Sequence, residues 1–184
     1  MKISQQRLEE NRQNLLDAAA RLLREQGCDK VGIADVTKAA GLTHGAFYNH
    51  FSSKDDMIAK VFVHVMLAQP EEEMPSSAGI DAFIQSYLTR EHVDNRATGC
   101  MYAAFASEIF RLPPSARGTL TQALTNLIAR LSQNMTLVSE AERRRVAITK
   151  WSTMLGGLIL ARAVDDPALS DEILNGVLHS LSAD

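Results

Sequence analysis

The sequence has few of the features that mark a secreted, membrane-spanning or metal-binding protein. Only two of its 184 residues are cysteine, Cys28 and Cys100, so it has neither a disulfide framework nor a zinc-binding cysteine pattern. No uninterrupted apolar run reaches about 18 residues, the length that a membrane-spanning helix needs. The amino-terminal residues 1–6 lead into a polar segment rather than the apolar stretch of a signal peptide. These absences predict a cytoplasmic protein with no membrane span.

The patterns that carry catalysis are missing as well. We find no phosphate-binding loop, no metal-binding motif and no spacing of serine, histidine and aspartate typical of a hydrolase. His44 and His50 do not share a helix face and have no carboxylate partner, so contact with DNA explains them better than a metal does. The sequence therefore predicts no enzyme, no metal and no cofactor.

Charge is unevenly distributed along the chain. The net charge is −3, but residues 1–66 carry a small excess of positive charge and residues 67–184 carry the negative excess. This asymmetry fits an amino-terminal end that faces nucleic acid, although it does not decide the function alone.

Apolar residues recur with the period of a helix almost throughout, and no strand pattern is present. Leu15, Ala19 and Leu22 mark one face of a first helix, which Gly27 is expected to end. Residues 69–77 are rich in proline, glutamate and serine, which is typical of a solvated linker. We predict an all-α fold of about nine helices, over residues 7–26, 33–40, 43–51, 54–67, 78–93, 100–111, 115–137, 139–164 and 170–182.

The segment from Val31 to Lys54 predicts a helix-turn-helix. Gly41 supplies the positive φ that a tight turn between two short helices requires. The apolar residues Val36, Leu42, Phe47 and Phe51 would dock these helices on the first one. In a helix-turn-helix the second helix lies in the major groove of DNA.

The second helix of this segment has the side chains that such a role needs. Its first residues would point at base edges, Gly45 would let the backbone come close, and Lys54 would add charge at the start of the next helix. The predicted DNA-binding residues are Thr43, His44, Gly45, Tyr48, Asn49, His50 and Lys54.

The order of residues here closely resembles the signature of the tetracycline-repressor (TetR) family of transcription regulators. The matching elements are Gly27, Asp35-Val36, Ala40-Gly41-Leu42-Thr43, Phe47-Tyr48-Asn49-His50-Phe51 and Ser53-Lys54-Asp55. Two positions depart from the pattern. Gly32 stands where the family has a serine or threonine whose hydroxyl reaches a phosphate, and Thr37 stands where alanine is usual.

The resemblance implies a helix-turn-helix DNA-binding domain over residues 1–53 and a larger helical domain over residues 54–184 that binds an effector and dimerises. The implied protein is a repressor that binds a near-palindromic operator in double-stranded DNA as a homodimer. A small apolar or reactive effector would release it. A DNA-binding architectural protein without a ligand is the alternative.

The effector pocket and the dimer interface are expected on the carboxy-terminal helices. Cys100 follows a glycine at a predicted helix start, so it is either a reactive thiol or a small buried residue. The candidate pocket residues are Tyr87, Cys100, Met101, Tyr102, Phe105, Trp151 and Met154. The candidate interface residues are Trp151, Leu155, Gly157, Leu158, Ile173, Val177 and Leu178.

Overall fold

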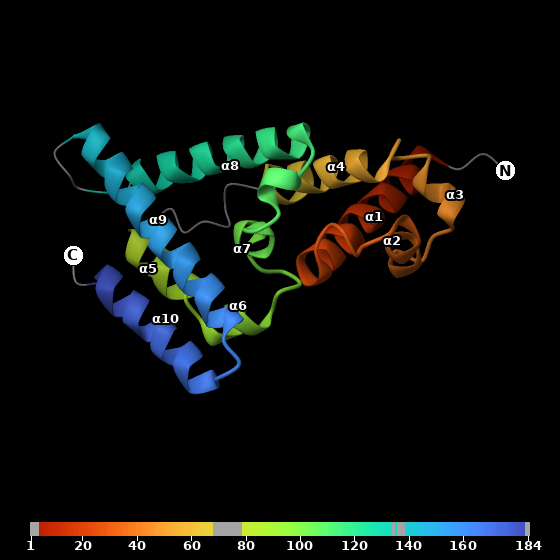
Figure 1. Ribbon diagram of the computed structural model, residues 1–184. Helices are drawn as coiled ribbons and strands as arrows, with labels where there is room; N and C mark the ends of the chain where they lie inside the picture. The colour runs from red at the N-terminus through yellow and green to blue at the C-terminus, as the bar shows by residue number, and fades with distance from the viewer. Residues whose placement is uncertain (1–3, 68–78, 134, 136–138, 183–184) are drawn as a thin grey trace. The chain divides into compact units, whose positions relative to one another are not determined.

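The computed structural model describes residues 4–67, 79–133, 135 and 139–182, and every regular element in these ranges is helical (Figure 1). The predicted all-α fold is therefore confirmed. The elements are α1 (Gln5–Gln26), α2 (Ile33–Ala39), α3 (His44–Phe47), α4 (Lys54–Met66), α5 (Gly79–Tyr87), α6 (Arg90–Asp94), α7 (Met101–Phe105), the 3₁₀ turn η2 (Ile109–Arg111), α8 (Pro114–Gln133), α9 (Glu140–Ala163) and α10 (Pro167–Ser182). The predicted linker 69–77 lies outside the described residues.

Helix α1 begins and ends where local chemistry dictates. The Ser4 hydroxyl accepts a hydrogen bond from the backbone amide of Arg7, which satisfies one of the free donors of the first turn. The helix ends at Gly27, which has φ +83° and donates its amide to the carbonyl of Leu23 at 2.9 Å. Its buried face consists of Leu15, Leu16, Ala18, Ala19, Ala20, Leu22 and Leu23.

Helices α2 and α3 are joined by the predicted glycine turn. Gly41 has φ +68°, and the amide of Leu42 donates to the carbonyl of Thr37 at 2.8 Å, which closes the turn. At the start of α2, the Asp35 carboxylate accepts a hydrogen bond from the amide of Gly32 at 2.9 Å. The aspartate thus pairs the amide of Gly32, although residue 32 has no side chain to cap the helix itself.

The third helix is shorter than the predicted range of 43–51. It ends at Phe47, whose carbonyl accepts hydrogen bonds from the amides of both His50 and Phe51 at 3.0 Å. Since one of these bonds spans only three residues, the chain tightens into a turn rather than extending the helix. Thr43 occupies the cap position, but its side chain makes no capping bond.

Helix α4 begins with a side-chain cap. The Ser53 hydroxyl accepts a hydrogen bond from the amide of Asp56 at 3.0 Å, and the Asp56 carboxylate accepts one from the amide of Ser52 at 2.8 Å. Near the end of the helix, the His64 ring lies 2.7 Å from the Asp17 carboxylate of α1. The contact between His64 and Asp17 joins α4 to α1.

Two predicted helices are each divided in the structure. The range 78–93 forms α5 and α6, because the Thr89 hydroxyl accepts a hydrogen bond from the amide of His92 at 3.1 Å and starts a new helix. The range 100–111 forms α7 and the 3₁₀ turn η2. No proline or glycine marks the first break, so the sequence pattern did not reveal it.

The last two helices run close to the predicted ranges. Ser139 caps α9 by accepting a hydrogen bond from the amide of Glu142 at 3.2 Å. The last helix begins earlier than the predicted range, and Ser170 does not cap it. Helix α10 begins at Pro167, where the missing amide costs nothing, and the Asp166 carboxylate accepts the amide of Ala168 at 2.8 Å. The Ser170 hydroxyl donates instead to the carbonyl of Ala161 at 2.7 Å.

The chain divides into two compact units. The first contains residues 1–69 and 104–121, and the second contains residues 70–103 and 122–184. The functional division at residues 53 and 54 stays a prediction. Among the described residues, no helix combines the length and apolar character needed to cross a membrane.

The conformation of Gly27 generates a stability prediction. Its φ of +83° and ψ of +166° suit glycine alone, and a Cβ there would lie 2.6 Å from Oε1 of Glu108. We expect Gly27→Ala to lower the free energy of unfolding by about 2 kcal/mol or more. Gly41→Ala, with φ +68° but open space around it, should cost about 1 kcal/mol.

Gly118→Ala is the control, because Gly118 lies within α8 with nothing near its Cβ position. This change should raise stability by about 0.5–1 kcal/mol. Urea denaturation of the three variants measures the effects. Equal losses of unfolding free energy in Gly27→Ala and Gly118→Ala would contradict this explanation.

Candidate nucleic-acid interface

The orientation of α3 is set by two buried phenylalanines. Phe47 and Phe51 are fully buried, and their ring centroids lie 5.1 Å apart. Val36 of α2 is also fully buried. Because one side of this short segment is committed to the core, its other side must face outward.

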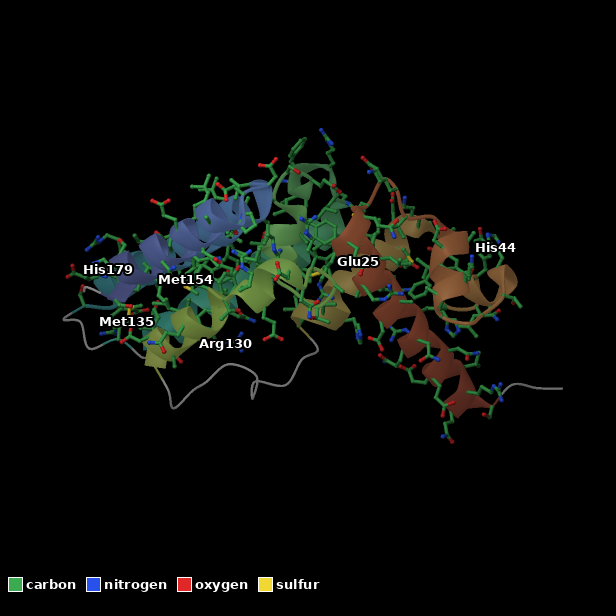
Figure 2. All side chains as sticks on the ribbon, turned by 90° about the horizontal axis from the view of Figure 1, so that it is seen from below. Glu25, His44, Arg130, Met135, Met154 and His179 are labelled. Carbon is green, nitrogen blue, oxygen red and sulfur yellow. The ribbon has the colours of Figure 1, made fainter. Side chains whose placement is uncertain are left out.

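The outward side carries five of the seven predicted DNA-binding residues. Thr43, His44, Gly45, Tyr48 and Asn49 are all exposed, and Tyr48 keeps 56% of its surface accessible. The His44 and Tyr48 rings meet edge to face, with centroids 5.5 Å apart. Figure 2 shows the His44 side chain on the outer surface of this region. The result is a continuous surface of ring, amide and hydroxyl groups.

His50 does not belong fully to this surface. It is half-buried, and its Nε2 is buried without a hydrogen-bond partner among the described residues. Burial, and next the positive charge of Arg12, hold the pKa of His50 below its ordinary value. His50 is therefore neutral at pH 7. Its carbonyl oxygen accepts a hydrogen bond from Lys60 Nζ at 3.1 Å.

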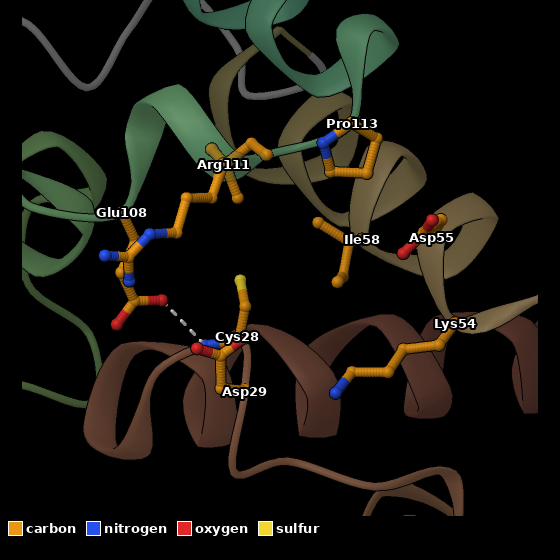
Figure 3. A pocket seen from close by; sticks show the side chains of 9 residues that line it. Cys28, Asp29, Lys54, Asp55, Ile58, Glu108, Arg111 and Pro113 are labelled. Atoms are coloured by element: carbon orange, nitrogen blue, oxygen red, sulfur yellow. Dashed lines mark hydrogen bonds between the residues drawn. The ribbon is translucent and has the colours of Figure 1, made fainter.

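Lys54 is also half-buried and lines a cavity together with Cys28 and Asp29 (Figure 3). Lys54 is thus less exposed than the five outward residues of the α3 segment. Arg12 and Lys60 are two further cations beside His50 that the sequence did not single out. Arg12 approaches through tertiary packing, which leaves no local signal.

Comparison with known proteins places this segment in a family. The sequence profile described as "Bacterial regulatory proteins, tetR family" matches residues 15–61, which contain α2, the glycine turn, α3 and the start of α4. Residues 15–61 of the chain therefore match the DNA-binding segment of the TetR family of transcriptional regulators.

Individual relatives match only part of the chain. The HTH-type transcriptional regulator AcrR of Shigella flexneri is 39% identical over 59 residues, which are 32% of this chain and 27% of AcrR. The HTH-type transcriptional repressor KstR2 of Rhodococcus jostii is 28% identical over 111 residues, which are 59% of this chain and 54% of KstR2. The matches therefore span about a quarter to a half of these relatives.

The fold as a whole is similar to that of solved family members. The crystal structure of the reduced form of E. coli NemR superposes with a TM-score of 0.78 at 21% identity, covering 93% of this chain and 94% of that one. A TetR regulator from Legionella pneumophila gives 0.73 at 22% identity, covering 100% of this chain and 98% of that one. At this level of identity the likeness concerns the fold alone.

The second unit contains an aromatic cluster around Trp151. The ring of Trp151 lies 5.3 Å from that of Tyr87 and 5.8 Å from that of Tyr102, both edge to face. Phe83 stacks on it at 6.3 Å. Met154 is fully buried on the same helix, and Figure 2 shows where it lies. Six of the seven candidate pocket residues, all except Phe105, belong to this unit.

Phe105 lies apart from the other candidates. It belongs to the first unit, where its ring packs on Phe62 of α4 with centroids 5.2 Å apart. Phe105 is therefore part of the core of the first unit.

His92 and Tyr87, two polar residues of the cluster, are neutral at pH 7. The amide of Cys100 donates to Nε2 of His92 at 3.1 Å, so that the other ring nitrogen, Nδ1, donates to the carbonyl of Tyr87 at 2.7 Å. Burial lowers the pKa of His92. Burial, and next the neighbouring Cys100, raise the pKa of the Tyr87 hydroxyl. Arg162 closes the site by donating to the carbonyls of His92 and Val93.

The candidate interface residues separate into two groups. Trp151, Gly157 and Leu158 are buried within the chain, so they present no surface to a partner. A Cβ on Gly157 would lie 3.0 Å from Val177, which shows that this glycine allows α9 and α10 of one chain to approach. The remaining candidates are half-buried, namely Leu155, Ile173, Val177 and Leu178.

Proposed function

We propose that this protein is a ligand-responsive transcriptional repressor that binds a near-palindromic DNA operator as a homodimer. The observation that carries the proposal is the exposed polar face of α3, held outward by the buried Phe47 and Phe51. The similarity to the transcriptional regulator AcrR and the transcriptional repressor KstR2 supports it. This role implies that the protein is not an enzyme and that it acts in the cytoplasm, where bacterial DNA lies.

The exposed groups suit the edges of bases in a major groove. The His44 ring and the Asn49 amide can donate and accept hydrogen bonds, and Gly45 has open space around it, so the backbone can approach DNA closely. Tyr48 can donate its hydroxyl to a phosphate oxygen. For Lys54 to reach a phosphate, its side chain must leave the cavity that it lines.

These roles predict two kinds of mutant. Lys54→Ala and Tyr48→Phe should weaken binding to every DNA sequence, and Lys54→Ala should reduce the salt dependence by about one ion. Thr43→Ala and His44→Ala should instead relax the preferred sequence, because a well-placed hydrogen-bonding group at a base edge supplies about 1–3 kcal/mol of discrimination. Fluorescence anisotropy with selected and random duplexes measures both effects.

Arg144→Ala is the control for this experiment, because it removes an exposed cation of α9 far along the chain from α3. It should leave both affinity and preference unchanged. The assignment of roles is wrong if Lys54→Ala alters the preferred sequence while non-specific affinity stays intact.

Exposed apolar residues and small residues on α9 and α10 support the dimer, because they would form a two-fold interface. On α9, Gly156 and Leu160 are one turn apart, and on α10, Leu169, Ile173 and Gly176 share a face. Leu160 is 57% exposed and Leu169 is 41% exposed, while both glycines have open space at Cβ. Small residues beside exposed leucines allow close approach of a second copy.

Leu160→Glu should therefore convert the dimer into a monomer at micromolar concentration, because it places a charge in an apolar interface. Ile148→Glu is the matched control. Ile148 is on the same helix and 41% exposed, but it lies on another face, so its variant should remain a dimer. Sedimentation velocity distinguishes the two states. An unmodified protein that sediments as a monomer at this concentration would rule out the dimer.

The aromatic cluster supports a small apolar or aromatic effector, because it combines ring surface with hydrogen-bonding groups. The effector must bind the state that releases DNA more tightly than the state that binds it. A hundredfold preference corresponds to about 2.7 kcal/mol, and operator DNA must weaken effector binding by the same factor. Helix α7 would couple effector binding to DNA binding. This short helix contains Met101, a candidate pocket residue, and Phe105, whose ring packs on Phe62 of α4.

We expect a thermal-shift screen of apolar metabolites, drugs and electrophiles to find compounds that raise the melting temperature and also lower operator affinity. Repeating the screen on Cys100→Ser separates reversible binding from covalent reaction at this thiol. If every stabilising compound leaves operator affinity unchanged, the chain is an architectural DNA-binding protein and not a sensor.

A further inference from the structure

The first unit contains a cavity of about 150 Å³ that the proposed function does not use (Figure 3). It lies between the segment that follows α1, the start of α4 and the segment around η2. All of its lining residues belong to the first unit, whereas the aromatic cluster belongs to the second. The lining residues are Cys28, Asp29, Lys54, Asp55, Ile58, Glu108, Arg111, Leu112 and Pro113.

One wall of the cavity is fixed by Glu108. Its Oε2 accepts a hydrogen bond from the amide of Cys28 at 3.0 Å, across 80 positions of the sequence. Its Oε1 lies over Gly27, in space that any Cβ at residue 27 would enter. The carboxylate thereby ties the segment around η2 to the end of α1.

The middle of the cavity is apolar. Ile58 and Leu112 are buried, and Pro113 completes this side. Burial, and next the charge of Glu108, raise the pKa of the Cys28 thiol to about 12. The thiol is therefore protonated at neutral pH and acts as an apolar surface rather than as a nucleophile.

The edge of the cavity carries charges of both signs. Lys54 and Arg111 are cations, and Asp29 and Asp55 are anions. In the part of the chain that the structure describes, none of these four side chains forms an ion pair with another residue. The Arg111 guanidinium lies instead over the exposed ring of Phe110, at 4.9 Å from its centroid.

We propose that this cavity binds a small zwitterion of amino-acid size. The ligand's carboxylate would interact with both Lys54 and Arg111, its ammonium group with the carboxylates of Asp29, Asp55 or Glu108, and its short apolar body with Cys28 and Ile58. A ligand with a single charge satisfies only one kind of group on the edge. The volume excludes a molecule as large as a nucleotide or a drug.

A ligand in this cavity would also affect DNA binding, an inference that rests on the proposed function. Lys54 cannot hold a ligand carboxylate and a DNA phosphate at the same time. The zwitterion is therefore a second effector, separate from any compound in the aromatic cluster, and it lowers the affinity for DNA of any sequence.

Isothermal titration calorimetry of the full chain without DNA tests the site. The probes are L-alanine and 4-aminobutanoate, with butanoate and butylamine as single-charge controls at equal ionic strength. We expect saturable binding of at least one zwitterion, and weaker binding of both controls by about tenfold, which is about 1.4 kcal/mol. Arg111→Gln should weaken zwitterion binding by a similar factor.

Arg117→Gln is the matched control, since Arg117 is an exposed cation of the same unit that does not line the cavity. It should bind the zwitterion as the unmodified chain does.

The proposal is overturned if neither zwitterion binds saturably, if butanoate or butylamine binds as well, or if both arginine variants lose the same affinity. Because these measurements contain no DNA, a failure here is distinguishable from a failure of the proposed repressor function. That function fails on operator binding, which the calorimetry does not involve.

Discussion

The exposed face of α3 depends on one constraint, the burial of Phe47 and Phe51. Helix α3 contains only four residues, and isolated helices shorter than about 12–15 residues are marginal in water. Its geometry must therefore come from tertiary packing. Full burial of a phenylalanine is worth about 3–5 kcal/mol when judged by truncation to alanine, which far exceeds what four helical residues supply alone.

The surrounding polar groups follow from this packing. Once Phe51 enters the core, the chain must turn before α4, and Ser53 and Asp56 satisfy the amides that the turn leaves free. Lys60 then reaches the carbonyl of His50. These bonds hold the end of the α3 segment against α4, and α4 in turn packs on α1, so the exposed face is rigidly supported.

Local signals in the sequence predicted much of the fold. Gly27 and Gly41 both have positive φ because only glycine adopts that conformation at little cost, and this preference needs no tertiary information. Ser53 caps its helix for a similarly local reason. The outward group of α3 residues followed from helical periodicity once the apolar positions were known.

Features that depend on distant partners were not predictable in this way. Trp151 has the spacing of an interface residue, but rings from other helices cover it. Lys54 matches a family motif, yet it lines a cavity beside Cys28. Glu108 stands 80 positions from the residue whose amide it accepts, so no sequence window contains both partners.

The central claim is that two copies of α3 read two half-sites of one operator. Hydroxyl-radical footprinting of the unmodified protein, on the DNA upstream of its own gene, tests this claim most directly. The account predicts two equal protected patches related by a two-fold axis, with centres about 34–36 Å or a multiple of that apart. A single patch, or diffuse protection that vanishes uniformly as salt is raised, would contradict it.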